Sequence, residues 1–270
     1  MVKLEKWVLD ILADPILKKH ANSEIFKNAN GILDARVFFK NSLGFSQWDC
    51  GQDGYENIER NERDYNYFIS EINHDRPTYE HFHLSGTILD VGGGVGTVRQ
   101  FLSDDTKFIS IDPSMSCLDE VTSNKRKAYT CLERPLNFIC GMAEFLPFTN
   151  EQFDWVHMRS VIDHFHVPDM AMLEAYRVLK DDGNILVGLT VKGGRTGKVT
   201  FKEVAKDVIK MGLNCIGIDK YKDHHIWHPT FLELVKLIED NGFIVQDVYW
   251  QPNWNEQVCY IWGKKDKFWK

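Results

Sequence analysis

The stretch Thr87-Ile88-Leu89-Asp90-Val91-Gly92-Gly93-Gly94-Val95-Gly96-Thr97-Val98 decides the fold of this chain of 270 residues. Its apolar part, 87–91, predicts a buried strand that runs into a glycine loop and then a helix from Val98. Glycines suit a loop that turns tightly and lets the backbone approach a ligand. A second apolar run, 108–111, ends in Asp112. This acid falls about 20 residues past the loop, where a doubly wound fold places the carboxylate that binds a ribose.

Strands and helices alternate regularly after the glycine loop. The predicted strands are 87–91, 108–111, 137–140, 155–158 and 185–191, and helices are predicted near 115–124 and 171–179. Thr230 and Glu233 match a capping box that starts another helix, and strands 243–249 and 257–262 follow as a hairpin. We therefore predict an α/β fold with a Rossmann-like, doubly wound, mostly parallel seven-stranded sheet, an antiparallel edge strand and a small N-terminal module.

The residue pattern of the glycine loop also indicates which class of nucleotide-like ligand the fold binds. A dinucleotide loop reads G-x-G-x-x-G, and Thr97 in the last position counts against a nicotinamide oxidoreductase. The loop instead reads D-x-G-x-G-x-G, and the motifs that follow it are Gly141-Met142-Ala143-Glu144-Phe145-Leu146-Pro147-Phe148, Phe153-Asp154-Trp155-Val156 and Tyr176-Arg177-Val178-Leu179-Lys180-Asp181-Asp182-Gly183. On these motifs, residues 87–191 resemble the class I S-adenosylmethionine-dependent methyltransferases, and among them the UbiE-like methyltransferase-domain family.

The resemblance implies S-adenosyl-L-methionine as the cofactor. It places the glycine loop, Arg159 and Ser160 at the methionine end and Asp112 on the ribose. Asp90 would fix the loop or bind the amino group, and Pro113, Met115 and Ala143 would lie beside the adenine. The family usually has an acid where this chain has Met142, so Glu144 is either its substitute or a solvated loop acid. The candidate cofactor-binding residues are Asp90, Gly92, Gly94, Gly96, Asp112, Pro113, Met115, Met142, Ala143, Glu144, Arg159 and Ser160.

Histidines supply the candidate catalytic groups. Methyl transfer needs alignment, exclusion of water and, for a hydroxyl acceptor, a base. Related enzymes commonly have a histidine pair where this chain has Asp163 and His164, and a neutral histidine beside a carboxylate can act as a base near pH 7. A structural role for His164 is the alternative.

Three residues are candidate contacts for the substrate. Tyr67 belongs to a predicted helix before the first strand, where related methyltransferases place a helix across the cofactor; anchoring of a docked helix is the alternative. His225 and Trp227 belong to the run Asp223-His224-His225-Ile226-Trp227-His228, which we predict to be a substrate-contacting loop. This run lacks the H-E-x-x-H pattern and a cysteine framework, so we predict no metal site.

The chain divides into two predicted parts. Residues 1–50 form a small N-terminal module, and residues 51–270 form the methyltransferase domain with a cap insertion at about 192–229. The stretch 7–15 resembles the start of a zinc-ribbon module that partners some methyltransferases, but it lacks the Cys-Pro-x-Cys motif. A helix followed by a hairpin is the alternative. The module is also a candidate contact for oligomerisation.

The composition of the chain counts against some classes of function and partner. The formal charge of −7 and the lack of a basic stripe count against nucleic acid as a partner. Six dispersed cysteines suit free thiols in the cytosol, and no apolar run reaches the ~18 residues of a membrane span. Taken with the resemblance above, these features lead us to predict a cytoplasmic enzyme that methylates a small molecule through an O-, N- or C-nucleophile. The alternatives are a non-catalytic S-adenosylmethionine-binding or interaction protein and an RNA methyltransferase.

Overall fold

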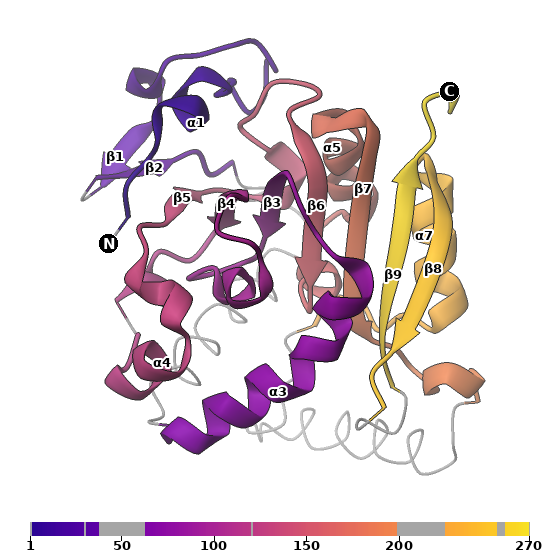
Figure 1. Ribbon diagram of the computed structural model, residues 1–270. Helices are drawn as coiled ribbons and strands as arrows, with labels where there is room; N and C mark the ends of the chain where they lie inside the picture. Colours follow the sequence, from indigo (N-terminus) through magenta and orange to yellow (C-terminus); the bar gives the residue numbers. More distant parts are fainter. Residues whose placement is uncertain are drawn as a thin grey trace, which may run out of the picture.

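The computed structural model describes residues 2–29, 31–37, 63–119, 121–198, 225–252 and 257–269. In these residues nine strands form one sheet in the order β1-β2-β5-β4-β3-β6-β7-β9-β8 (Figure 1). The strands are β1 (Lys27–Ala29), β2 (Ile32–Asp34), β3 (Thr87–Val91), β4 (Lys107–Asp112), β5 (Asn137–Cys140), β6 (Phe153–Arg159), β7 (Leu179–Thr190), β8 (Phe243–Trp250) and β9 (Val258–Lys265). The helices are α1 (Lys6–Asp10), α3 (Tyr65–Phe82), α4 (Ser123–Ala128), α5 (Pro168–Val178) and α7 (Phe231–Asp240).

The seven strands from β5 to β8 form the predicted doubly wound sheet. Strands β5, β4, β3, β6 and β7 are parallel to one another, and β9 is antiparallel to both β7 and β8. The reversed strand therefore lies one position inside the edge, which β8 forms. The predicted fold class is confirmed.

An N-terminal hairpin extends this sheet at the other edge. Strand β2 pairs antiparallel with β1 and parallel with β5, and Leu33 lies opposite Ile139. Val8 and Leu12, in and after α1, are fully buried in the main core. The element order thus corresponds to a helix followed by a hairpin. The predicted boundary near residue 50 and most of the cap insertion at 192–229 lie outside the described residues, so the division into domains stays a prediction.

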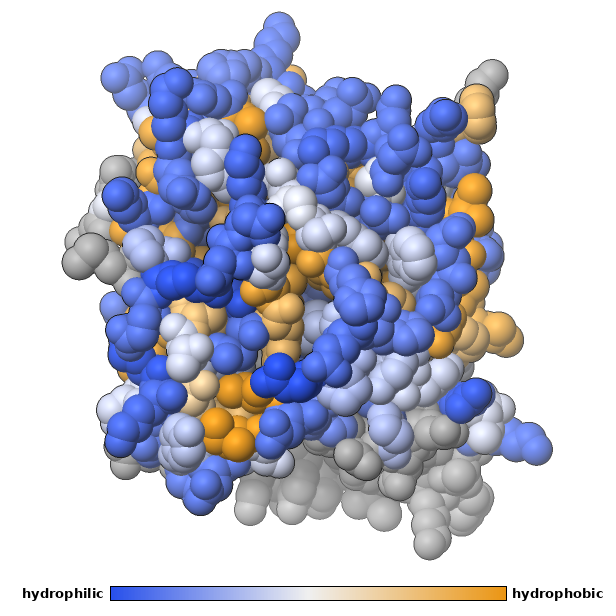
Figure 2. Space-filling view, in the orientation of Figure 1, coloured by the Kyte–Doolittle hydropathy of each residue, from blue (hydrophilic) through white to orange (hydrophobic). Residues whose placement is uncertain are grey.

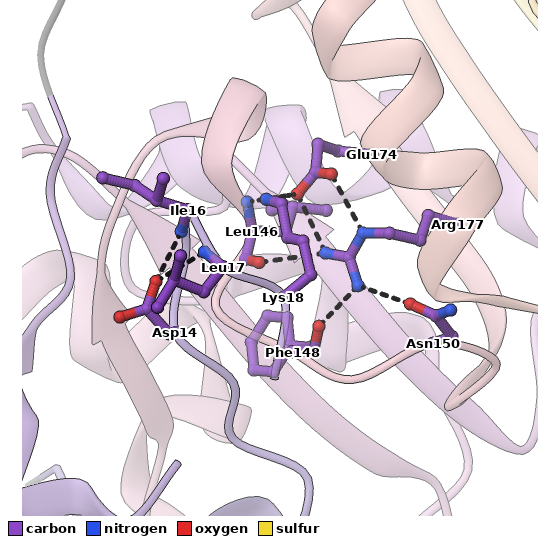
Figure 3. A network of polar contacts seen from close by, with 9 residues as sticks. All are labelled: Asp14, Ile16, Leu17, Lys18, Leu146, Phe148, Asn150, Glu174 and Arg177. Atoms are coloured by element: carbon purple, nitrogen blue, oxygen red, sulfur yellow. Dashed lines mark hydrogen bonds and ion pairs between the residues drawn. The ribbon is translucent and has the colours of Figure 1, made fainter. Parts of the chain in front are cut away.

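A polar network fastens the N-terminal segment to α5 (Figure 3). The Lys18 Nζ lies 2.5 Å from Glu174 Oε2, and the Arg177 guanidinium donates to both oxygens of the same carboxylate at 2.9 Å. The Leu146 N–H also donates to Glu174 Oε2 at 2.9 Å, and Arg177 donates to the carbonyl oxygens of Leu146 and Phe148. Because Glu174 is only 8% exposed, these contacts bind three separate segments of the chain into one packed unit.

Helices cover both faces of the sheet (Figure 1). On one face, Tyr79 and Phe82 of α3 pack with Ile88 and Trp155 of the sheet. On the other face, α5 and α7 contribute to the core that contains Leu89, Val156 and Ile185. Since neighbouring residues of a strand point to opposite faces, each central strand supplies both cores.

Two predicted helices are wrong in detail. The segment predicted as a helix near 115–124 forms a 3₁₀ turn, Ser116–Leu118, and then α4. Thr122 has an extended backbone and its side chain accepts a hydrogen bond from the Lys125 N–H, so it starts a new helix instead of continuing one. The helix predicted from Val98 is a 3₁₀ helix, Thr97–Phe101, because the extended backbone of Leu102 ends it after five residues. The capping box of α7 forms as predicted.

Figure 2 shows that hydrophilic residues cover most of one side of the molecule, with apolar residues in smaller groups, one of them along the edge that β8 and α7 form. The exposed large hydrophobic side chains of these elements include Leu232 and Ile244. In the described part of the chain, no helix is both long and apolar enough to cross a bilayer. The cysteines there, Cys117, Cys131, Cys140 and Cys259, form no disulfide bond with one another.

Candidate functional site

A cavity of about 290 Å³ lies at the carboxyl ends of β3, β4, β5 and β6. Chain order runs from β3 to β4 and β5 in one direction and to β6 in the other, so the cavity sits where the strand order reverses. Doubly wound sheets bind ligands at this position. The predicted site residues that line the cavity are Gly92, Gly94, Asp112, Pro113, Met142, Ala143, Glu144, Arg159, Ser160 and His164.

The glycine loop needs its small residues for two different reasons. A Cβ on Gly93 would collide with the carboxylate of Asp90, so this position closes the loop onto the sheet. Gly94 has a φ of +48°, and the atom nearest to an added Cβ would be Cys117 Cβ at 4.0 Å. Gly94 therefore presents its backbone to open space in the cavity wall.

Asp112 is held between the loops that follow β3 and β4. Its Oδ2 accepts a hydrogen bond from the Gly94 N–H at 3.0 Å, and its Oδ1 accepts one from the Ser114 N–H at 2.9 Å. A carboxylate oxygen can accept more than one hydrogen bond, so both oxygens can also accept from a ligand's hydroxyl groups. The two amides fix the carboxylate in the cavity wall in advance.

Two predicted cofactor residues lie beneath the loop and do not line the cavity. Asp90 is 4% exposed, and its Oδ1 lies 2.7 Å from His157 Nδ1, whose Nε2 lies 3.2 Å from the Tyr79 hydroxyl. Burial raises the pKa of Tyr79 well above its usual value, so the phenol stays neutral. A Cβ on Gly96 would approach Phe108 to 2.9 Å, which places this glycine against the core. Both residues support the loop from below, as the prediction for Asp90 allowed.

Glu144 is a buried acid, and its interpretation as a solvated loop residue is wrong. It is 1% exposed, and its Oε1 accepts a hydrogen bond from the His166 N–H at 2.8 Å. Its Oε2 has no hydrogen-bond partner among the described residues, although Glu144 lines the cavity. Burial raises the pKa of this carboxyl, against the opposing effect of the backbone N–H groups that it binds. The cavity wall thus contains an acceptor that a ligand can satisfy.

Arg159 joins the end of β6 to α3. Its guanidinium binds both oxygens of Asp75, at 2.5 and 2.8 Å, and Asp75 is 1% exposed. Gln251 donates to the same carboxylate at 3.3 Å. The next residue, Ser160, has a φ of +52°, which is unusual for a residue with a side chain. Strain of this kind at a cavity wall is typical of functional sites.

A polar cluster borders the cavity beyond Ser160. Asp163 and His164 lie in a 3₁₀ turn, Ile162–His164, that follows β6. Asp163 Oδ1 lies 3.8 Å from His164 Nε2, Asp163 Oδ2 lies 3.5 Å from His225 Nε2, and the centres of the two imidazole rings are 4.6 Å apart. The fold thus brings the two predicted catalytic residues together with His225, a predicted substrate contact.

Other predicted site residues lie elsewhere. Tyr67 on α3 is 44% exposed, with Arg63 over its ring, and it does not line the cavity. Met115 packs at the edge of the α3-side core instead of lining the cavity, and Trp227 packs against the main core. Asp223 and His224 lie outside the described residues.

Besides Gly93 and Val95 of the predicted loop, the structure adds cavity residues that the sequence analysis did not identify: Val91, Thr97, Ile111, Ser114, Ser116, Cys117, Lys125, Gly141, Val161 and Phe165. No local pattern shows that Lys125, near the start of α4, faces the cavity. Ser114 and Ser116 follow Asp112 closely, and their hydroxyl groups lie 2.8 Å apart. Their position after a strand that ends in an acid is the one signal that could have identified them.

The fold and the cavity define a class of protein: a doubly wound α/β domain with a site for a nucleoside-like ligand above its strand ends. Comparison with known families agrees. The family model described as "Methyltransferase domain" matches residues 89–187, which run from β3 into β7. Over these residues the chain is therefore similar to a methyltransferase domain, in agreement with the resemblance seen in the sequence.

Known proteins support this assignment over part of the chain. The ubiquinone/menaquinone biosynthesis C-methyltransferase UbiE of Agrobacterium fabrum is 35% identical over 106 residues, which are 37% of this chain and 39% of that protein. An uncharacterized methyltransferase of Schizosaccharomyces pombe is 33% identical over 104 residues, which are 36% of this chain and 37% of that protein. This chain spans between 37% and 54% of the length of the curated relatives that it matches.

Solved structures share the fold at lower identity. A methyltransferase from Thermotoga maritima has a TM-score of 0.55 at 18% identity, over 82% of this chain and 100% of that one. The 1,6-didemethyltoxoflavin-N1-methyltransferase of Burkholderia thailandensis, with bound S-adenosylhomocysteine, has a TM-score of 0.50 at 12% identity, over 82% of this chain and 87% of that one. These two likenesses concern the fold.

Proposed function

We propose that this protein transfers the methyl group of S-adenosylmethionine to a small-molecule acceptor. The observation that carries the proposal is the Asp112 carboxylate, held in the cavity wall by the Gly94 and Ser114 amides at 3.0 and 2.9 Å. A carboxylate fixed in this way at the end of the second parallel strand suits the two hydroxyl groups of a ribose. A concave site of about 290 Å³ at the strand ends is of the size that binds small ligands.

The cavity residues fit this cofactor. The space above Gly94 is open, so the loop backbone can approach the amino-acid end of the ligand. Glu144 Oε2 is buried and has no partner among the described residues, and an adenine amino group is the kind of donor that would satisfy it. Glu144 thus takes the role of the acid that is replaced by Met142. When bound, the cofactor supplies an electrophilic methyl group on a sulfonium centre.

The acceptor side of the site is assigned to the residues after β6. His164 lines the cavity, and Asp163 lies beside it with its Oδ1 3.8 Å from the imidazole. We assign to His164 the removal of a proton from the acceptor, with Asp163 stabilising the charged imidazole that results. Val161 and Phe165 also line the cavity and exclude water from the reacting atoms. We further propose a cytoplasmic location, and the N-terminal module as a contact for oligomerisation.

Calorimetric titration with S-adenosylmethionine and with S-adenosylhomocysteine tests the cofactor assignment. We expect both ligands to bind, and Asp112→Asn to weaken each by about tenfold or more, the loss expected for charge-assisted hydrogen bonds. Asp105→Asn is the matched control, because Asp105 is exposed and does not line the cavity. Unchanged affinity in Asp112→Asn would contradict the ribose assignment.

A further inference from the structure

Three side chains bring metal-ligating atoms together at the edge of the cavity. Asp163, His164 and His225 each offer one such atom, and these atoms lie within 4.8 Å of one another. Across the residues that the structure describes, this is the one group of three or more histidine, cysteine or acidic side chains placed in this way. Two histidines come from segments that are about 60 residues apart in the chain, so folding creates the group.

One oxygen of the cluster's carboxylate has no hydrogen-bond donor in the part of the chain that the structure describes. Asp163 is 8% exposed, and its Oδ1 has no hydrogen-bond partner among the described residues. Its distance of 3.8 Å to His164 Nε2 is too long for a hydrogen bond. A buried carboxylate oxygen without a partner is costly, and a cation in the cluster would remove this cost.

The backbone holds His225 over the other two donors. The carbonyl oxygen of Asp163 accepts hydrogen bonds from the Ile226 N–H at 2.8 Å and the Trp227 N–H at 3.2 Å. Trp227 in turn packs against the main core. The two segments are therefore fastened by their main chains, independently of the three donor side chains, and the donors are arranged in advance.

We propose that Asp163, His164 and His225 bind a divalent metal ion of the zinc class. Imidazole nitrogen and carboxylate oxygen are ligands that this class prefers, at about 2.0–2.2 Å from the ion. Four-coordinate geometry with such bonds separates neighbouring ligand atoms by about 3.3 Å. In the structure one donor atom of each residue lies within 4.8 Å of the other two, so side-chain rotations would bring the three atoms to that separation. The sequence predicts no metal site, and the donors proposed here come from two segments that only folding brings together.

Three protein ligands leave a position open to a further ligand, as in catalytic zinc sites. Because His164 also lines the cavity, a bound ion would border the cavity. In that form His164 Nε2 would be a ligand instead of a base, and the ion would lower the pKa of a bound acceptor hydroxyl, whose proton would pass to solvent water. This last step rests on the proposed function, but the metal site itself does not.

Metal titration of the full chain, without a histidine tag and after treatment with a chelator, tests the site. Cobalt(II) absorption and zinc calorimetry are measured without cofactor or acceptor, and we expect one ion per chain. Asp163→Asn and His225→Gln should each weaken binding by more than about tenfold, the smallest loss typical of residues that merely support a metal ligand. Asp163→Asn keeps the shape of the side chain, and thermal melting shows whether each variant is folded.

His81→Gln is the matched control. His81 lies 2.6 Å from Asp247 on the surface, as a histidine beside a carboxylate with no third donor, and we expect metal binding to be unchanged. Equal binding by the wild type, Asp163→Asn and His225→Gln would overturn the inference, as would a wild type that binds no ion. Because these titrations contain no S-adenosylmethionine, either result would leave the proposed methyl transfer standing. Conversely, loss of the Asp112→Asn effect would overturn the cofactor assignment alone.

Discussion

Gly94→Ala separates the backbone demands of the glycine loop from its contact with a ligand. Gly94 has a φ of +48° and Gly197 a φ of +64°, so alanine at either position adopts a left-handed backbone at a cost of about 1–2 kcal/mol. Neither new methyl group is crowded, since its nearest neighbour would be 4.0 Å away at Gly94 and beyond 4 Å at Gly197. The two positions differ in that Gly94 lines the cavity, whereas Gly197 is exposed and does not.

The expected effects follow from this difference. A loss of 1–2 kcal/mol lowers the melting temperature by about 2–8 °C in a domain of this size, and both variants should show it. Only Gly94→Ala places a methyl group where the cofactor approaches the loop. We expect its affinity for S-adenosylhomocysteine to fall by about tenfold or more, which is a free energy of about 1.4 kcal/mol or more. Calorimetric titration and thermal melting of the two variants give both quantities.

The outcomes that refute this reasoning are specific. If Gly94→Ala and Gly197→Ala bind S-adenosylhomocysteine equally well, the loop does not contact the ligand. If Gly94→Ala melts far below Gly197→Ala, the space above Gly94 is packed instead of open. Gly93→Ala should be the least stable of the three variants, because its methyl group would collide with the buried Asp90 carboxylate.

Further variants test the rest of the site and its support. His164→Ala should lower turnover by about 10²–10⁴-fold and leave affinity for the cofactor nearly unchanged, as measured by transfer of labelled methyl groups; full activity would make His164 structural. Burial raises the pKa of Glu144, so the wild type should lose stability as pH rises from the ordinary value of 4.5 through the raised one. In thermal melts, Glu144→Gln should not show that loss of stability. If the melting temperatures of the wild type and the variant change in parallel with pH, the Glu144 carboxyl is not the group that titrates. Glu174→Gln should cost about 1–3 kcal/mol in denaturant unfolding, because it weakens the contacts of Lys18 and Arg177; a change near zero would show that the N-terminal segment is held by other contacts.

Local patterns in the sequence determined the strands and the cofactor loop. The runs 87–91 and 137–140 coincide with β3 and β5, because a continuous apolar run can be satisfied only inside a sheet that is covered on both faces. The spacing from the glycine loop to Asp112 reflects a single strand-turn-helix-strand unit. This unit is short enough for its residue spacing to be recognised in the sequence. The capping box of Thr230 and Glu233 is likewise formed by neighbours in the chain.

Contacts between distant segments were decided by the tertiary structure. Asp90 meets His157 because β3 and β6 pair in one register, which no local pattern specifies. Asp75 reaches Arg159 only because α3 packs across the sheet. Glu144 is shielded from solvent only because the segment around His166 folds over it. Asp163, His164 and His225 meet for the same reason. Propensity and periodicity act over a few residues, whereas the positions of these side chains depend on how whole elements pack. Local sequence patterns therefore predicted the ligand loop, and only the tertiary structure determined the acceptor side of the site.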